Sequence, residues 1–191
     1  MSELTDDGTD PRIARTRRVV GAATLEELAV AGYGGFTIES VARRARVSKS
    51  TIYRHWSGKL PLIADALERM NTQPARSPGV GSARDRVGEL VGHLAAAMRD
   101  PTLSGSAPAL AEAAERDPVI ARFHHSYNDR RRQALVDAIR DGVERGELAD
   151  GVDPELAALM LAGAVVYARM MTARPLADTQ ADALVNQLFG D

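Results

Sequence analysis

Residues 37–56 constrain the fold of this chain more than any other stretch. In their first part, apolar residues recur three and four positions apart, which is the spacing of one helical face. These residues are Ile38, Val41, Ala42 and Ala45. The second part begins at Ser48, a good helix N-cap, and places its apolar residues at Ile52 and Trp56. The pattern predicts two short helices separated by a tight corner.

The outer face of the second helix is small, polar, cationic or aromatic: Lys49, Ser50, Thr51, Tyr53, Arg54 and His55. Such a pair resembles a DNA-binding helix-turn-helix, whose second helix enters the major groove. Residues 11–60 hold ten basic and three acidic residues, a net charge of +7, whereas residues 61–191 carry −5. These charges could simply cover solvated faces. Their coincidence with the helix pair favours a phosphate-facing module on a mildly acidic body.

Helical periodicity without evident strand patterns predicts an all-α fold of about nine helices. We expect a helix-turn-helix domain over residues 11–59 and a helical body over residues 60–191. The first helix stops at the glycine-rich segment 32–35. Later helices are expected over 60–70, 83–99, 118–146, 155–172 and 179–189. Residues 101–108 are irregular or begin a short helix, residues 1–10 form a disordered tail, and residues 71–83 form a loop.

The helix Glu155–Thr172 is apolar on nearly every side, so it must be buried all round. One side can face its own domain and the other a second subunit. No apolar run reaches the roughly 18 residues of a membrane span, because Arg169 interrupts the longest one. The acidic N-terminus lacks a signal-peptide core and the chain has no cysteine. We therefore expect a cytoplasmic protein that does not associate with membranes.

In its layout of helices and motifs, the chain resembles the TetR family of bacterial transcription regulators. The residues that carry the resemblance are Ala22-Ala23, Gly32-Tyr33, Thr37-Ile38, Val41-Ala42, Ala45-Arg46-Val47-Ser48, Thr51-Ile52-Tyr53-Arg54-His55-Trp56 and Lys59-Leu60. The chain departs from the family pattern at Arg46, where glycine is usual, at Ser50 and at Trp56, where phenylalanine is usual. The resemblance implies three DNA-binding helices and, over residues 60–191, a ligand-binding and dimerisation domain of about six helices. That domain would dimerise through its last two helices, Glu155–Thr172 and Thr179–Phe189. It also implies that the protein binds a double-stranded DNA operator and a small-molecule effector. Members of the family are most often repressors.

Carried onto this sequence, the resemblance implies DNA contacts from Thr37, Arg43, Arg44, Ser48, Lys49, Ser50, Thr51, Tyr53, Arg54, His55 and Lys59. Five of these residues have a plainer alternative. Thr37 can be only a helix cap, Tyr53 a half-buried core aromatic, and Lys59 a solvated lysine. Arg43 and Arg44 can follow the DNA backbone or only solubilise their helix.

The body should hold a mostly apolar effector. Candidate lining residues are Met98, Phe123, Tyr127, Met160, Tyr167 and Met171. Methionine and tyrosine give an adaptable pocket with a few polar groups, although each residue can equally belong to the ordinary core. Residues 60–70 would couple this body to the DNA-binding helices.

No cofactor is expected. The possible metal ligands are His93, His124 and His125. The last two are adjacent, and side chains at adjacent helix positions point about 100° apart, so they cannot chelate a metal as an i, i+4 pair could.

Two other functions are weaker. An enzyme is not supported, because the sequence has no nucleophile elbow, phosphate loop, paired catalytic carboxylates or cysteine. A helical adaptor that dimerises without binding DNA would leave the +7 segment and the polar row 49–55 unexplained.

Overall fold

The structure, a computed structural model, describes residues 11–74 and 81–190, and within these ranges all regular secondary structure is helical. The helices are α1 (Pro11–Gly35), α2 (Ile38–Ala45), α3 (Lys49–His55), α4 (Lys59–Met70), α5 (Ala83–Arg99), α6 (Pro101–Ala114), α7 (Pro118–Glu144), α8 (Pro154–Thr172) and α9 (Asp178–Phe189). The predicted all-α fold is confirmed. The expected N-terminal tail and residues 75–80 of the expected loop lie outside the described residues.

Most helix boundaries follow from local capping chemistry. Helices α6, α7 and α8 each begin with proline after an aspartate whose carboxylate accepts backbone N–H groups: Asp100, Asp117 and Asp153. Of the two alternatives for residues 101–108, the structure has the helix, which continues past Pro108 for 14 residues in all. Gly32, at φ 66° and ψ 173°, interrupts the helical path of α1 where the glycine-rich stop was predicted.

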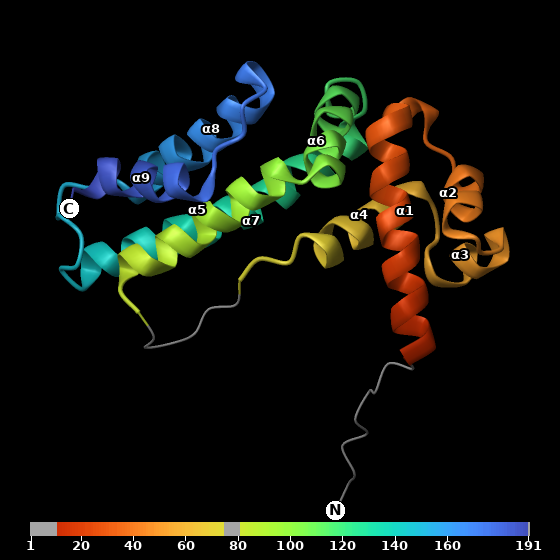
Figure 1. The fold of residues 1–191 in the computed structure, drawn as a ribbon, viewed down its shortest axis with the longest axis horizontal. Coiled ribbons are helices and arrows are strands. Elements are labelled where there is room, and N and C mark those ends of the chain that lie inside the picture. Colours follow the sequence, from red (N-terminus) through yellow and green to blue (C-terminus); the bar gives the residue numbers. More distant parts are fainter. Residues whose placement is uncertain (1–10, 75–80, 191) are drawn as a thin grey trace, which may run out of the picture.

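Figure 1 shows an elongated molecule with α2 and α3 at one end and α8 and α9 at the other. Between them, α5 and α7 run side by side along the body. Helices α4 and α6 both pack on α1, so they connect the two ends. The fit between α6 and α1 is close, because a Cβ added at Gly105 would lie 2.9 Å from the Cβ of Ala29.

Buried side chains form two hydrophobic cores. The first core is formed by side chains of the four helices α1, α2, α3 and α4, of α6 and of the first turns of α7. It extends to Leu110, Ile120 and Tyr127. The second joins α5, the rest of α7, α8 and α9, with Val91, Ile139 and others fully buried. The first core therefore contains α4 and α6 as well as the helices of the expected domain 11–59.

Helix α8 is long and apolar enough, by length and composition alone, to cross a membrane, despite Arg169. The expectation that no segment would meet that criterion is therefore wrong. A core helix of a globular protein passes the same test, and the inner face of α8 is packed against α5 and α7, with Ala158, Leu161 and Val165 fully buried. Its outer face is exposed and apolar, at Leu156, Leu159, Met160, Val166, Tyr167 and Met171. Within one chain, α8 is thus covered on one side only.

Candidate nucleic-acid interface and internal cavity

The helix pair of α2 and α3 is built by two hydroxyl caps and a left-handed corner. Thr37 Oγ1 accepts a hydrogen bond from Ser40 N at 3.1 Å, and Ser48 Oγ accepts one from Thr51 N at 3.1 Å. Between the helices, Arg46 has φ 55° and ψ 43°. This left-handed conformation costs a residue with a Cβ roughly 1–2 kcal/mol. Arg46 thus adopts the conformation for which the family usually supplies glycine.

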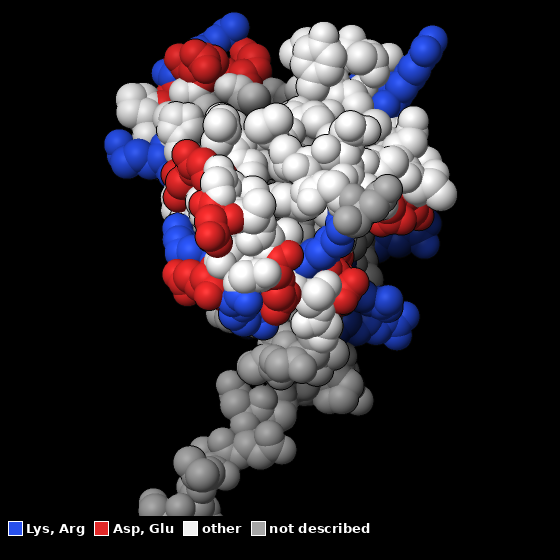
Figure 2. Space-filling view, turned by 90° about the vertical axis from the view of Figure 1, so that its left-hand side faces the viewer, with Lys and Arg blue, Asp and Glu red and all other residues white. Residues whose placement is uncertain are grey.

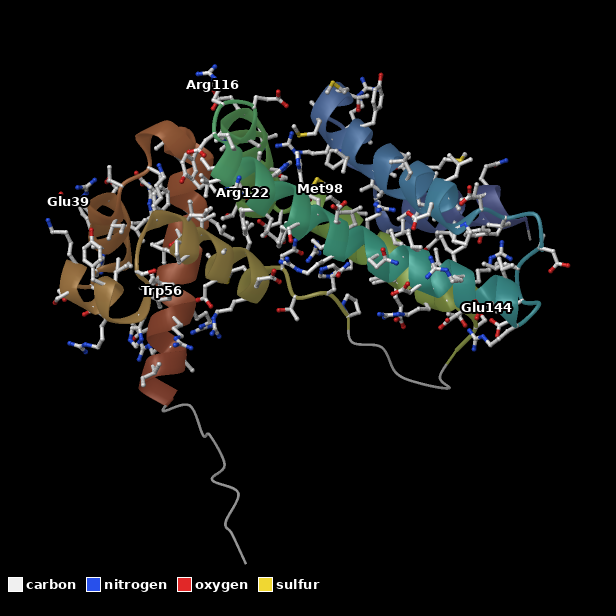
Figure 3. The ribbon with its side chains drawn as sticks, turned by 180° about the vertical axis from the view of Figure 1, so that it is seen from behind. Glu39, Trp56, Met98, Arg116, Arg122 and Glu144 are labelled. Carbon is white, nitrogen blue, oxygen red and sulfur yellow. The ribbon has the colours of Figure 1, made fainter. Side chains whose placement is uncertain are left out.

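Apolar contacts set the orientation of α3. Ile52 is fully buried and Trp56 is 5% exposed, which confirms the predicted inner face. Trp56 Nε1 also donates a hydrogen bond to Asp65 Oδ2 in α4 at 3.1 Å. Figure 3 shows Trp56 beside α4 and α1, away from the outer surface of α3. The end of α3 is therefore fixed directly to α4.

The opposite face of α3 is open to solvent. Tyr53 is 56% exposed, so it is not the core aromatic of the plainer alternative. Lys49, Ser50 and Arg54 are also exposed, while Thr51 and His55 are half-buried. Lys49 Nζ lies 3.4 Å from Glu39 Oε1 in a solvent-exposed pair, which water and salt weaken. This face presents a hydroxyl-rich, cationic and aromatic surface to whatever binds there.

Two predicted DNA contacts are directed at protein groups instead. Arg44 donates to Glu27 Oε2 at 3.0 Å and to Glu26 Oε2 at 3.4 Å, and so links α2 to α1. Lys59 Nζ donates to the carbonyl of Tyr33 and lies 3.7 Å from the centre of the Tyr33 ring. Partial burial lowers the pKa of Lys59. By contrast, Arg43 is exposed and bonds only Ser40 Oγ, at 3.2 Å, among the described side chains.

A second candidate site is a cavity of about 450 Å³ in the body, between the two cores. Its lining is mainly apolar and comes from α4, α5, α6, α7 and α8, including Leu67, Leu94, Met98, Leu103, Leu110, Tyr127, Leu135, Val166 and Met170. Figure 3 shows Met98 in the middle of the body. Of the six residues expected to line a pocket, the structure brings Met98 and Tyr127 together here.

The other four expected lining residues lie elsewhere. Phe123 packs against the first core. Met160, Tyr167 and Met171 are exposed on the outer face of α8. The α8 wall of the cavity is formed instead by Ala162, Gly163, Val166 and Met170. Because one residue turns a helix by about 100°, Met170 lines the cavity while Met171 is exposed, and Val166 lies at the border, lining the cavity while 40% exposed.

One end of the cavity is polar and joins α4 to α7. Asn71 Nδ2 donates to Tyr127 Oη at 3.2 Å, and Arg131 donates to Asn71 O at 2.7 Å and to Asn71 Oδ1 at 3.1 Å. Burial raises the pKa of Tyr127, and burial followed by the charge of His125 lowers the pKa of His124. Sequence reasoning missed this network, because Arg131 stands in a run of three arginines that looks like a solvated face.

Among the described residues, no group of three or more histidine, cysteine or acidic side chains could hold a metal ion. The rings of His124 and His125 have centroids 5.8 Å apart and are tilted by 57°.

A short, exposed second helix anchored by buried Ile52 and Trp56 defines a DNA-binding protein of the helix-turn-helix class. Family models match both halves of the chain: "Bacterial regulatory proteins, tetR family" over residues 22–66, and "Tetracyclin repressor-like, C-terminal domain" over residues 77–188. The chain belongs to the TetR family of DNA-binding transcription regulators. This is a family of regulators rather than of enzymes.

Individual relatives agree with this assignment. The chain is 28% identical to the uncharacterized HTH-type transcriptional regulator Rv1556 of Mycobacterium tuberculosis, over 99% of this chain and 94% of that protein. It is 49% identical over 47 residues, 25% of each chain, to the DNA-binding transcriptional repressor TetR of Mycobacteroides abscessus. The crystal structure of FadR from Bacillus subtilis in complex with stearoyl-CoA is similar in fold, with a TM-score of 0.67 and 17% identity, covering 90% of this chain and 97% of that one.

Proposed function

We propose that this regulator is a cytoplasmic homodimeric repressor. It binds a nearly palindromic operator through α3 and is released when a small, mostly apolar effector enters the cavity. The observation that carries the proposal is the exposed polar face of α3, held in place by the buried side chains on its other face.

Lys49 and Tyr53 are the main proposed DNA contacts on this face. The ammonium of Lys49 can reach a phosphate or a guanine, and the exposed ring of Tyr53 can contact a phosphate or a thymine methyl group. We count six further residues as contacts: Arg43, Ser50, Arg54 and Thr37, which are exposed, and Thr51 and His55, which are half-buried. Ser48 contributes mainly by capping α3. Each phosphate contact should add about 0.9 to the slope of log K against log salt.

We assign Arg44 and Lys59 supporting roles in this proposal. Both hold α1 against the helices that follow it. Arg44 does so by binding the carboxylates of Glu26 and Glu27, and Lys59 by binding the carbonyl of Tyr33. A phosphate contact by either side chain would require it to leave these partners.

The outer face of α8 supports the dimer. Its exposed apolar residues recur at helical spacing and form one stripe, of which Leu159, Met160 and Tyr167 are members. Figure 2 shows a broad uncharged surface at the end of the molecule that carries α8 and α9. A contiguous apolar surface of this kind marks an interaction site. A two-fold dimer would place two copies of α3 about one DNA turn, roughly 34 Å, apart.

The dimer can be tested by a charge in the stripe. Leu159→Arg should give monomers in sedimentation velocity at concentrations where the unmodified protein is dimeric. Val30→Arg is the matched control, because Val30 is 79% exposed on α1, outside the stripe. Dimers that persist with Leu159→Arg would reject α8 as the interface.

The cavity supports the effector. Its volume of about 450 Å³ lies in the usual range of roughly 300–1,000 Å³ for small-molecule sites. FadR of Bacillus subtilis, which is similar in fold, was solved in complex with stearoyl-CoA.

Operator binding is tested by selecting random-sequence duplexes with the purified protein and sequencing those retained. We expect an enriched motif with two-fold symmetry and half-sites about 10 base pairs apart. Enrichment of an unsymmetrical motif would contradict a dimeric repressor, and the absence of any enriched motif would contradict sequence-specific binding.

A further inference from the structure

Arg131 carries a positive charge into the cavity without a carboxylate to balance it. Its neighbours in the sequence are neutralised: Arg130 pairs with Glu68 at 2.6 Å, and Arg132 pairs with Glu155. Within residues 11–74 and 81–190, no ion pair includes Arg131, although it lines the cavity. A partly buried cation that lacks an anion is costly unless a ligand supplies one.

The guanidinium of Arg131 is instead held by neutral groups at one residue. It donates to the backbone carbonyl and the side-chain carbonyl of Asn71, at 2.7 and 3.1 Å. Asn71 is the C-cap of α4. The carbon Cζ of Arg131 also lies 5.4 Å from the centre of the Tyr127 ring. Arg131 therefore ties the end of α4 to α7 by bonds that a better acceptor could replace.

Resting on the proposed function, we propose that the effector is an amphipathic organic anion with a carboxylate on an apolar body. Its carboxylate pairs with Arg131, and its apolar body lies among Leu94, Met98 and Leu110. The pairing draws the guanidinium away from Asn71 and releases the end of α4.

The chemistry of the walls selects this class of ligand. Most of the lining is aliphatic, and the positive charge is gathered at its α7 wall, where Asp129 lies near Arg132. Hydrogen bonds from a guanidinium to a carboxylate are charge-assisted and about twice as strong as those to neutral carbonyls. His124 adds a buried Nδ1 that has no hydrogen-bond partner among the described residues. Asp129 is the one carboxylate of the lining, and it is solvent-exposed and lies 4.0 Å from Arg132 rather than paired with Arg131. A cationic head group would therefore be repelled by Arg131.

The release of α4 would reach the DNA-binding helices directly. Helix α4 begins at Lys59, three residues after the C-cap of α3 at Trp56. Trp56 is bonded to Asp65 of α4, and it is the one tryptophan of the chain. Its fluorescence therefore monitors the α3–α4 junction without a label.

The test compares three probes that share one tail and differ in their head group: decanoic acid, 1-decanol and decylamine. Each is titrated into the purified protein by calorimetry, and the emission of Trp56 is recorded in parallel. We expect the acid to bind at least tenfold more tightly than the other two and to change the emission of Trp56. Arg131→Gln should remove this preference and the emission change.

Arg130→Gln is the matched control, since it removes one arginine from the next position, whose partner is Glu68 rather than a cavity group. It should leave the preference intact. Arg131→Lys keeps the positive charge and should retain a weaker preference for the acid. This variant therefore shows whether a loss of preference in Arg131→Gln reflects the lost charge or a folding defect. The proposal is overturned if no probe binds, if the alcohol or amine binds as tightly as the acid, or if Arg131→Gln keeps the preference. Operator binding by the ligand-free protein is measured in the same preparations. If the operator is bound but the probes fail, the effector proposal is wrong, whereas a loss of operator binding would count against the proposed function itself.

Discussion

Asn71 at the end of α4 donates a hydrogen bond from Nδ2 to the Tyr127 hydroxyl of α7 across 3.2 Å, and both side chains are buried. The same asparagine accepts two hydrogen bonds from Arg131. One residue therefore connects the last turn of the helix that follows the DNA-binding unit to the polar end of the cavity. The position of α4 and the state of the cavity are physically linked at this point.

Tyr127→Phe should destabilise the fold by about 1–3 kcal/mol, because it leaves the buried amide of Asn71 without its acceptor. Urea unfolding followed by circular dichroism measures this change. Tyr53→Phe is the control and should alter stability by less than about 0.5 kcal/mol, since Tyr53 is 56% exposed and lies outside the α8 stripe. Equal effects of the two substitutions would show that the hydrogen bond contributes nothing.

Arg46→Gly should stabilise the protein by about 0.5–1 kcal/mol. Arg46 has a positive φ, and glycine relieves the left-handed strain while adding some chain entropy to the unfolded state. The matched control is Arg43→Gly, inside α2, which should destabilise by about 1 kcal/mol. Chemical unfolding of both variants checks the opposite signs. A loss of stability in Arg46→Gly would mean that the arginine side chain stabilises the corner more than its backbone conformation costs.

Stability should fall as the pH drops below neutrality. Burial lowers the pKa of His93 and of His124 below 6.5, aided by the charges of Arg131 and His125 respectively. Between that ordinary value and the lowered ones, the unfolded chain binds more protons than the folded chain, so the free energy of unfolding decreases as pH falls. Urea midpoints measured between pH 7.5 and 5 should therefore decline.

A double variant, His93→Asn with His124→Asn, should show a flatter pH dependence over the same range. Asp85 does not interfere, since its pKa is lowered from 3.8 by hydrogen bonds from Ser82 and its effect lies at lower pH. An unchanged slope in the double variant would assign the pH dependence to other groups.

The helix-turn-helix and the helix order could be predicted from the sequence because their signals are local. Periodic apolar residues and hydroxyl caps identified α2 and α3, and Asp117 and Asp153 before proline identified the starts of α7 and α8. The equivalent start of α6 at Asp100 was left open, because Gly105 and Pro108 are poor helix formers. Packing of α6 against α1 outweighs that weak propensity.

The cavity was harder to predict, because its lining depends on contacts between distant helices. The stripe of α8 that lines the cavity adjoins the exposed stripe and shares Val166 with it. The periodicity of a helix that is apolar all round cannot separate the two stripes. Arg131 and Asn71 are 60 residues apart in the chain, and neither belongs to a motif. Only the tertiary fold brings them together.

The measurement that tests the central claim most directly is an electrophoretic mobility shift with the selected operator at physiological salt. Tyr53→Ala and Lys49→Ala should each abolish the shift while unfolding at the same urea concentration as the unmodified protein. Arg145→Ala, which also removes a positive charge but at the far end of α7, should bind normally. Normal binding by both α3 variants would contradict the assignment of α3 as the helix that recognises DNA.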